Sequence, residues 1–187
     1  MVKIGNLALG DFPLLLAPME DVSDPPFRAV CKQEGADLMY TEFISSEGLI
    51  RDAAKSVQKL DIYDYERPIG IQIFGSEIES MRQAAEIAEA AGPDILDINY
   101  GCPVHKVACK GAGAGILLDI DKMVSMTAEI VKQVKIPVTV KPASAGTITA
   151  SASWRWPKGC RMSAYRPSAS MPAPASRCTR ERPTGLT

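Results

Sequence analysis

The stretch Asp94-Ile-Leu-Asp-Ile-Asn-Tyr-Gly-Cys-Pro103 decides the fold. The apolar residues at its centre predict a short buried strand, and the Gly-Cys-Pro sequence ends that strand abruptly. Asn99 and Cys102 are therefore expected at the carboxyl end of a strand and in the loop that follows it. In parallel α/β folds, reacting groups gather at this end of the sheet. Cys102 is a candidate reacting group.

Four other apolar segments are predicted to be strands, and they alternate with segments of helical periodicity. The strands are expected at residues 14–19, 38–43, 68–74 and 137–141. Four helices are expected. The first follows an N-cap at Asp24 and ends at Gly35, and the second includes Leu49, Ala53 and Val57. The third begins at a Ser76–Glu79 capping box and ends at Gly92, and the fourth follows an N-cap at Asp121. A small hairpin is expected at residues 2–10. This order predicts a parallel sheet covered by helices.

Such a sheet is either open and doubly wound or closed into a (β/α)8 TIM barrel. An open sheet usually carries a glycine-rich nucleotide loop after its first strand. Here Pro18 stops the first strand, and that position has the sequence Ala17-Pro18-Met19-Glu20, which favours the barrel.

The composition changes near Lys141. Residues 1–141 carry 14 Lys and Arg against 21 Asp and Glu, a net charge of −7, whereas residues 142–187 carry seven against one. The tail contains only Ile148 and Leu186 among Ile, Leu, Val and Phe, too few to build a core. It is either a disordered basic tail that contacts RNA or the product of a shifted reading frame. The second is favoured, because the change falls at a strand end without a linker.

The whole chain is 46% hydrophobic and 23% charged, as in a soluble globular protein. Its five cysteines are too few and too irregularly spaced for a disulfide framework. The sequence has neither a signal-peptide pattern at its start nor an apolar run of about 18 residues. These features predict a cytoplasmic protein that keeps its thiols reduced and does not enter a membrane.

Several side chains near the predicted strand ends have more than one interpretation. Cys102 can be an acid, a nucleophile, a metal ligand or an inert thiol. Its spacing with His105 and Cys109 resembles a zinc site, but no usual metal motif surrounds these residues, and we predict no metal. The glycine-rich segment 110–115 lacks the Lys-Ser/Thr ending of a phosphate loop and is expected to be a flexible flap beside Cys102.

Two polar residues lie inside or at the end of apolar strands. Gln72 is flanked by isoleucines, and its buried amide either contacts a cofactor or makes a structural hydrogen bond. Lys141 ends the last predicted strand, where it is either functional or held in an ion pair.

Six motifs in one order resemble the tRNA-dihydrouridine synthases, most closely their bacterial B-type branch. They are Ala17-Pro18-Met19, Ser23-Asp24-x-Pro26-Phe27-Arg28, Gln72-Ile73-x-Gly75, Asp97-Ile98-Asn99-x-Gly101-Cys102-Pro103, Lys110-Gly111-x-Gly113-Ala114-Gly115 and Val138-Thr139-Val140-Lys141. The resemblance stops at Lys141. It implies the N-terminal part of an FMN-binding TIM barrel, truncated after about five strands, whose flavin is reduced by NADPH and then reduces the C5=C6 bond of tRNA uridines.

The resemblance also implies a role for each matching residue. Ala17, Pro18 and Met19 would lie along the flavin ring, Gln72 would bind its pyrimidine edge, and Lys141 would stand near N1 and O2. Asn99 would bind the target uracil, and Cys102 would protonate its C5 while hydride reaches C6. A thiol with a pKa near 8.5 is still protonated at neutral pH and can act in this way.

The chain departs from the family pattern in two respects. Tyr100 stands where Met is more usual, a minor change. The later strands, the flavin-phosphate loops and the helical tRNA-binding domain do not follow Lys141, so this chain is expected to hold FMN weakly or not at all and to be inactive by itself. The alternative functions are a flavin reductase of a free pyrimidine such as dihydroorotate, and a non-enzymatic fragment. The sequence does not indicate the oligomeric state.

Overall fold

The computed structural model describes residues 1–143 and the backbone of residues 160–162. The strands are β1 (Lys3–Ile4), β2 (Leu7–Ala8), β3 (Met39–Tyr40), β4 (Ile44–Ser45), β5 (Ile69–Phe74), β6 (Ile95–Tyr100), β7 (Val138–Pro142) and β8 (Cys160–Met162). The helices are α1 (Pro25–Gln33), α2 (Ser46–Ile50), α3 (Ala54–Gln58), α4 (Ile78–Ala90), α5 (His105–Ala108) and α6 (Ile120–Gln133), with 3₁₀ helices η1 (Asp64–Glu66) and η2 (Gly113–Leu118).

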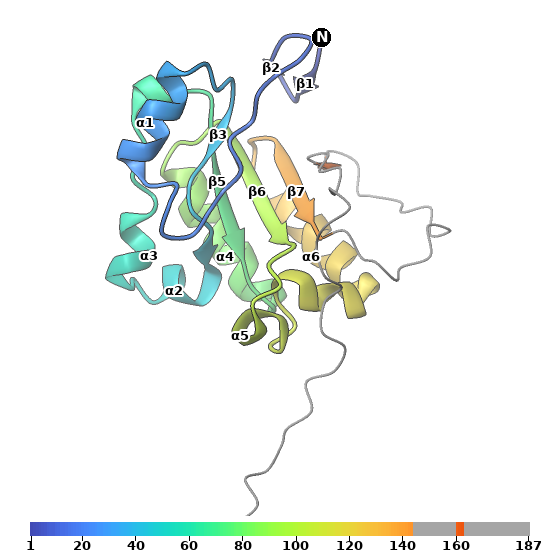
Figure 1. The fold of residues 1–187 in the computed structure, drawn as a ribbon. Helices are drawn as coiled ribbons and strands as arrows, with labels where there is room; N and C mark the ends of the chain where they lie inside the picture. The colour runs from blue at the N-terminus through green and yellow to red at the C-terminus, as the bar shows by residue number, and fades with distance from the viewer. Residues whose placement is uncertain (144–159, 163–187) are drawn as a thin grey trace, which may run out of the picture.

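The strand order distinguishes a barrel from a doubly wound sheet. The strands lie in the order β3-β5-β6-β7-β8, β4 also pairs with β5, and every one of these pairs is parallel. A doubly wound sheet reverses its order at a switch point, whereas here each strand lies beside the one before it. Right-handed crossovers then place the helices on one face, and Figure 1 shows α4 and α6 behind the sheet. The barrel prediction is confirmed.

Alternation along the strands gives the sheet two different faces. The outer face of β5, β6 and β7 packs against α4 and α6 in the main hydrophobic core. This core includes Ile71, Ile73, Leu96, Ile98, Val138 and Val140 from the strands and Met81, Ala85, Met123 and Ile130 from the helices. The inner face carries the polar side chains of the same strands and a smaller apolar cluster at its amino end.

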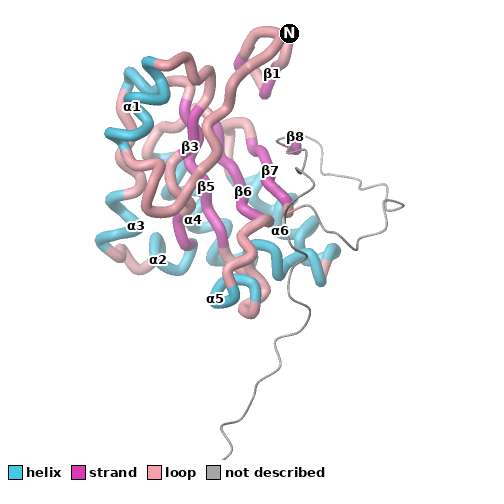
Figure 2. The backbone as a smooth tube through the Cα atoms, in the orientation of Figure 1, coloured by secondary structure: helices cyan, strands magenta, loops and turns pink. Residues whose placement is uncertain are grey.

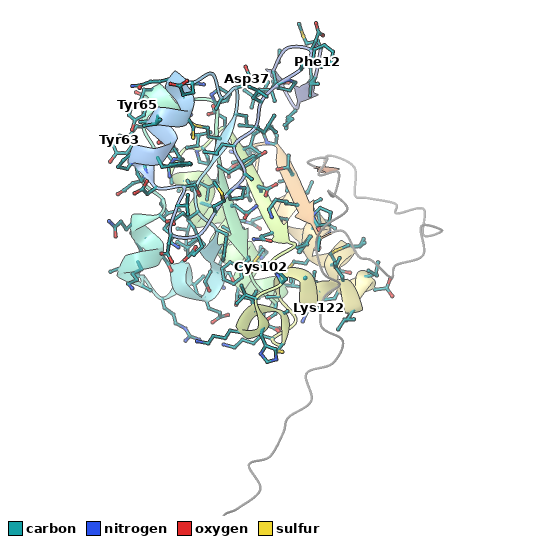
Figure 3. The ribbon with its side chains drawn as sticks, viewed as in Figure 1. Phe12, Asp37, Tyr63, Tyr65, Cys102 and Lys122 are labelled. Atoms are coloured by element: carbon teal, nitrogen blue, oxygen red, sulfur yellow. The ribbon has the colours of Figure 1, made fainter. Side chains whose placement is uncertain are left out.

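The hairpin β1–β2 closes the amino end of the inner face. Its strands pair antiparallel as predicted, with Gly5 at a φ of 55° in the turn. Ile4 and Leu9 pack with Leu38, Tyr40 and Ile95 in the smaller cluster. The hairpin therefore covers the end of the sheet opposite to Cys102, as Figure 3 shows.

The prediction of a buried strand at residues 14–19 is wrong. Only a single parallel bridge joins Leu15 to Leu38, and Figure 2 shows the chain between β2 and α1 as loop. Leu14 is 65% exposed. The backbone of residues 14–16 bonds to residues 37 and 38, so within the described residues this part has a neighbouring strand on one side only, whereas Met19 bonds to Val22 and Ser23 in the turn that follows.

Two other predicted elements differ from the structure. The strand expected at 38–43 is shorter than predicted, because β3 covers only Met39–Tyr40 and β4 begins after the predicted end. Between them, the Thr41 hydroxyl donates to the Glu42 carbonyl. The helix expected around Leu49, Ala53 and Val57 forms α2 and α3 instead. Asp52 between them has a φ of 51°, a left-handed conformation that no helix can continue.

Helix ends follow the predictions in part. Asp24 accepts from the Phe27 amide at 3.0 Å, and Gly35 ends α1 with a φ of 95°. The capping box at Ser76 and Glu79 is wrong, because Glu77 is the N-cap of α4 and Glu79 binds Arg82 instead. The cap of α6 is Asp119 rather than Asp121, and its carboxylate accepts from the Lys122 amide.

Most of the predicted tail lies outside the described residues. Its described part includes β8, which pairs parallel with β7, joining Val138 to Cys160 and Val140 to Met162. A strand at this edge was not expected from the sequence.

Candidate active site

Three of the predicted site residues lie on the inner face of the sheet. Gln72 in β5, Asn99 in β6 and Lys141 in β7 come from three adjacent strands. In the strand register, Gln72 lies beside Asp97, and Asn99 lies beside Lys141. Because neighbouring parallel strands present the same face to the barrel interior, these side chains meet near the carboxyl end of the sheet.

A continuous series of hydrogen bonds crosses these strands. The Gly101 amide donates to Asn99 Oδ1 at 2.9 Å, and Asn99 Nδ2 donates to Gln72 Oε1 at 3.1 Å. Gln72 Nε2 in turn donates to Asp97 Oδ2 at 2.5 Å, while the Thr139 hydroxyl donates to Asp97 Oδ1. Asn99 is 3% exposed and Gln72 is fully buried, so both amides have fixed partners.

Asp97 is an ionisable group deep inside this polar region. Burial raises its pKa from 3.8 to about 6, although the hydrogen bonds from Thr139 and Gln72 and the charge of Lys141 act in the opposite direction. Burial also raises the pKa of the Tyr40 hydroxyl, and the nearby Asp97 carboxylate raises it further. On the inner face, burial therefore disfavours the ionised form of a carboxyl group.

Cys102 lies in the loop directly after β6, at the carboxyl end of the strand (Figure 3). It is 7% exposed. Its carbonyl accepts from the Ala114 amide at 3.0 Å, which ties the loop to η2. A Cβ at Gly113 would lie 2.8 Å from this carbonyl oxygen and 3.0 Å from Cys102 Cβ. The glycine therefore allows the backbone to approach Cys102 closely.

The glycine-rich segment follows α5 and runs into η2. Residues 105–108 form α5, and residues 113–118 form η2. A Cβ at Gly115 would lie 2.0 Å from the Ala108 carbonyl oxygen, so this glycine is required by the packing of η2 on α5. The glycines thus serve close backbone packing beside Cys102, and their mobility stays a prediction.

Lys141 is a half-buried cation at the end of β7. The ion pair proposed as its alternative explanation is not found: within residues 1–143 no carboxylate lies close enough to Lys141 for a salt bridge. Its charge instead acts at longer range on Asp97.

The segment Ala17-Pro18-Met19 presents apolar surface. Ala17 is exposed, and Met19 is 37% exposed. The Met19 amide donates to the Ser23 hydroxyl oxygen at 2.9 Å, and that hydroxyl donates to the Met19 carbonyl at 3.0 Å. The buried Ser23 side chain therefore holds the backbone of Met19 in a tight turn.

Cys102, His105 and Cys109 do not form the metal-site geometry that their spacing resembles. His105 Nε2 and Cys109 Sγ lie 3.2 Å apart, and Cys102 is a free thiol. Cys109 is disulfide-bonded, so the prediction that all the thiols are reduced is wrong for this residue. In the described part of the chain, no three His, Cys, Asp or Glu side chains are grouped to hold a metal ion.

A cavity of about 990 Å³ lies apart from this polar region. It opens between α1, α3 and the ends of β4 and β5, and its lining includes Glu20, Arg28, Lys59, Tyr65 and Phe74. None of the predicted site residues lines it, so the predicted site is defined by the hydrogen-bonded side chains and not by this cavity.

Sequence reasoning missed Asp97 and Thr139 as members of the site. Both lie two residues before a predicted site residue in the same strand, Asp97 before Asn99 and Thr139 before Lys141. The period of two along a strand places such pairs on one face, and a polar residue there is a usable signal.

Comparison with known proteins identifies the family. The family model described as dihydrouridine synthase matches residues 15–143. The chain belongs to the dihydrouridine synthase family. It is 39% identical to a probable tRNA-dihydrouridine synthase of Rickettsia prowazekii over 142 residues, which cover 75% of this chain and 43% of the relative. It is 38% identical to the tRNA-dihydrouridine synthase B of Pseudomonas putida over 141 residues, which cover 75% and 41%.

A third relative is a probable tRNA-dihydrouridine synthase of Rhizobium leguminosarum, 41% identical over 128 residues, covering 68% of this chain and 40% of the relative. The match thus spans about two-fifths of the length of these curated relatives. No helix in the described part of this chain has the length and apolar character needed to cross a membrane.

Proposed function

We propose that this chain forms the flavin- and uridine-facing part of a tRNA-dihydrouridine synthase. The enzyme would reduce the C5=C6 bond of particular uridines in tRNA, with FMN as cofactor and NADPH as reductant. The observation that carries the proposal is the placement of Asn99 and Cys102 at the carboxyl end of β6, beside Gln72 and Lys141 from the adjacent strands. Membership of the dihydrouridine synthase family supports it.

The residues present fit an FMN ring. Lys141 is a cation with no salt bridge in residues 1–143, as is expected of a group that stabilises the anionic form of a reduced flavin. Ala17 and Met19 offer exposed apolar surface suited to an aromatic ring. Beyond its hydrogen bonds to Asp97 and Asn99, Gln72 retains one N–H hydrogen and one oxygen lone pair, enough for a contact with a pyrimidine edge. When bound, FMN would supply the hydride that reduces C6 of uracil.

Asn99 and Cys102 act on the uracil. Asn99 binds and orients the uracil through the amide hydrogen and the oxygen lone pair that its neighbours leave available. The Cys102 thiol holds a proton and delivers it to C5 of the base. The low exposure of Cys102 keeps water away from the thiol, which favours proton transfer to carbon over exchange with solvent.

The target base must leave the stacked tRNA to reach these residues. Residues 1–141 carry a net charge of −7, which attracts RNA poorly. We therefore propose that tRNA affinity comes from parts of the full-length enzyme outside residues 1–141, and that the basic residues 142–187 are the product of a shifted reading frame. The chain alone holds FMN weakly or not at all.

The test uses the full-length synthase that carries residues 1–141. It is incubated with NADPH, FMN and tRNA that lacks dihydrouridine, and in parallel with free uridine, uracil or orotate. Mass spectrometry then measures the reduced pyrimidine in each reaction. The proposal predicts dihydrouridine in tRNA and no reduction of the free compounds. Reduction of a free pyrimidine with unchanged tRNA would establish the alternative reductase instead.

A further inference from the structure

The polar residues of the inner face form a series of hydrogen bonds in which one end group can only donate and the other can only accept. At one end the Gly101 backbone N–H can only donate. At the other end the ionised Asp97 carboxylate can only accept, and it accepts from both Gln72 and Thr139. The two amides between these ends, those of Asn99 and Gln72, can each be placed in two orientations that have nearly the same shape.

The ends permit only one orientation of each amide. Gly101 requires the oxygen of Asn99, so the Asn99 NH₂ group faces Gln72. Asp97 requires the NH₂ group of Gln72, so the Gln72 oxygen faces Asn99. With both ends in place, every donor points from Gly101 towards Asp97. Turning either amide alone would place two NH₂ groups or two oxygens against each other in a buried site, which costs about 1–3 kcal/mol for each unsatisfied group.

We propose that Asp97 is a positioning residue, which fixes the orientation of the Gln72 and Asn99 amides from beneath the site. The orientation of the amides follows from the described hydrogen bonds alone. Its consequence for the reaction rests on the proposed function: each amide then offers one N–H and one oxygen lone pair in a set direction. A uracil or flavin pyrimidine edge, with its ring N–H beside a carbonyl, requires that pair of groups.

The burial of Asp97 makes this arrangement sensitive to pH. The titratable groups that face Asp97 are Tyr40 from β3 and Lys141 from β7, with the neutral Gln72 and Thr139 side chains between. Because burial raises the pKa of Asp97 to about 6, its carboxyl gains a proton within a mildly acidic range. A protonated carboxyl is also a donor, so it no longer forces the Gln72 NH₂ group towards itself.

Two substitutions separate positioning from simple support of the fold. Asp97→Asn retains an oxygen that accepts from Gln72, and its NH₂ group can donate to the Thr139 hydroxyl, which is able to accept. Asp97→Ala removes the acceptor altogether. Positioning therefore predicts that the asparagine variant keeps the amide orientation and loses its dependence on pH, whereas the alanine variant loses the orientation.

The experiment is a pH titration of the ¹⁵N-labelled full chain, followed by NMR of the side-chain NH₂ groups between pH 4.5 and 7.5. The signals of Gln72 and Asn99 are assigned through bonds to their backbones. Both pairs are expected to shift with one midpoint near pH 6, to stay constant in Asp97→Asn, and to exchange with solvent about tenfold faster in Asp97→Ala. Asp121→Asn, an exposed change of the same charge, is the control and should titrate like the parent chain.

A titration that persists in Asp97→Asn would overturn the proposal, and constant NH₂ signals in the parent chain would overturn its sensitivity to pH. Unchanged solvent exchange in Asp97→Ala would overturn the proposal too. The result is independent of the proposed function, because the readout needs neither flavin nor tRNA. If the amides titrate and the full-length enzyme leaves tRNA unreduced, the proposed function fails while the positioning role of Asp97 stands.

Discussion

The buried ion pair between Arg28 and Glu66 provides the sharpest prediction about stability. Arg28 is 2% exposed and Glu66 is fully buried. The guanidinium donates to both carboxylate oxygens, at 2.9 and 3.2 Å, and also to the carbonyls of Ser23 and Asp61 at 2.9 and 3.0 Å. The pair thereby joins the start of α1, next to the turn at Met19, to η1.

Arg28→Met keeps most of the side-chain volume and removes the charge. Glu66 then remains buried, and within residues 1–143 the Tyr63 amide, at 3.0 Å, is its one remaining hydrogen-bond donor. Breaking a buried pair in this way costs about 3–5 kcal/mol. Arg51→Met is the matched control, because the Arg51–Glu47 pair is exposed and of the i,i+4 type, and its loss costs about 0.3–0.5 kcal/mol.

Urea unfolding of the full chain, followed by circular dichroism, measures both losses of unfolding free energy. The double variant Arg28→Met/Glu66→Gln leaves no charge and retains an acceptor for Tyr63. Its loss should fall short of the sum of the two single losses by at least about 1 kcal/mol. An Arg28→Met loss as small as that of Arg51→Met, or strictly additive single losses, would refute the view that the pair is buried and coupled.

Three further predictions follow from the site and the tail. Gly113→Ala should lower the unfolding free energy by about 2–3 kcal/mol, because residue 113 has a φ of 53° and its new Cβ would meet Cys102. Gly111→Ala has a φ of 73° but open space around the new Cβ, so it should cost about 1 kcal/mol. Equal losses of the two variants in urea unfolding would contradict this. The raised pKa of Asp97 means that the folded chain binds a proton more tightly than the unfolded chain, so its contribution to stability is full below pH 3.8 and is lost as pH rises through about 6, by about 3 kcal/mol in all. Unfolding midpoints that do not differ in pH dependence between the parent chain and Asp97→Asn would refute that assignment. Sequencing the gene around codon 141 should reveal further strand and helix patterns in another reading frame, and their absence would favour the natural basic tail.

The order of strands and helices could be predicted from the sequence because it rests on local patterns. Apolar strands such as β5 and β6 are bounded by glycine and proline, and these signals do not depend on the rest of the fold. The choice of a barrel from the absence of a glycine-rich loop after Met19 was correct, but only the strand order decides it directly.

The parts that were missed depend on competition between neighbours. Glu79 has the right position for a capping box, yet Arg82 lies one turn away and takes its carboxylate. Asp52 gives no sequence signal for the left-handed turn that divides α2 from α3. The partners of Gln72 could not be predicted either, since the residue that fixes its amide, Asp97, lies on a different strand and is identified only by the register.

The roles of the individual site residues stay predictions until they are tested in the enzyme. The structure brings Gln72, Asn99 and Lys141 together on adjacent strands and places Cys102 directly after them. Tyr100, which departs from the family pattern, has a hydrogen-bond partner in the structure, because its hydroxyl lies 2.9 Å from the Thr127 hydroxyl behind the sheet. Tyr100 therefore belongs to the core and not to the site.

The most direct measurement of the central claim compares Cys102→Ala with Cys31→Ala in the full-length synthase. Both cysteines are free thiols, but Cys31 lies in α1, away from the site. Dihydrouridine formed in tRNA is counted by mass spectrometry, and reduction of the flavin by NADPH is followed separately. We predict that Cys102→Ala lowers the rate of dihydrouridine formation by roughly 10²–10⁴-fold while flavin reduction continues, and that Cys31→Ala changes neither. An unchanged rate in Cys102→Ala would contradict the account.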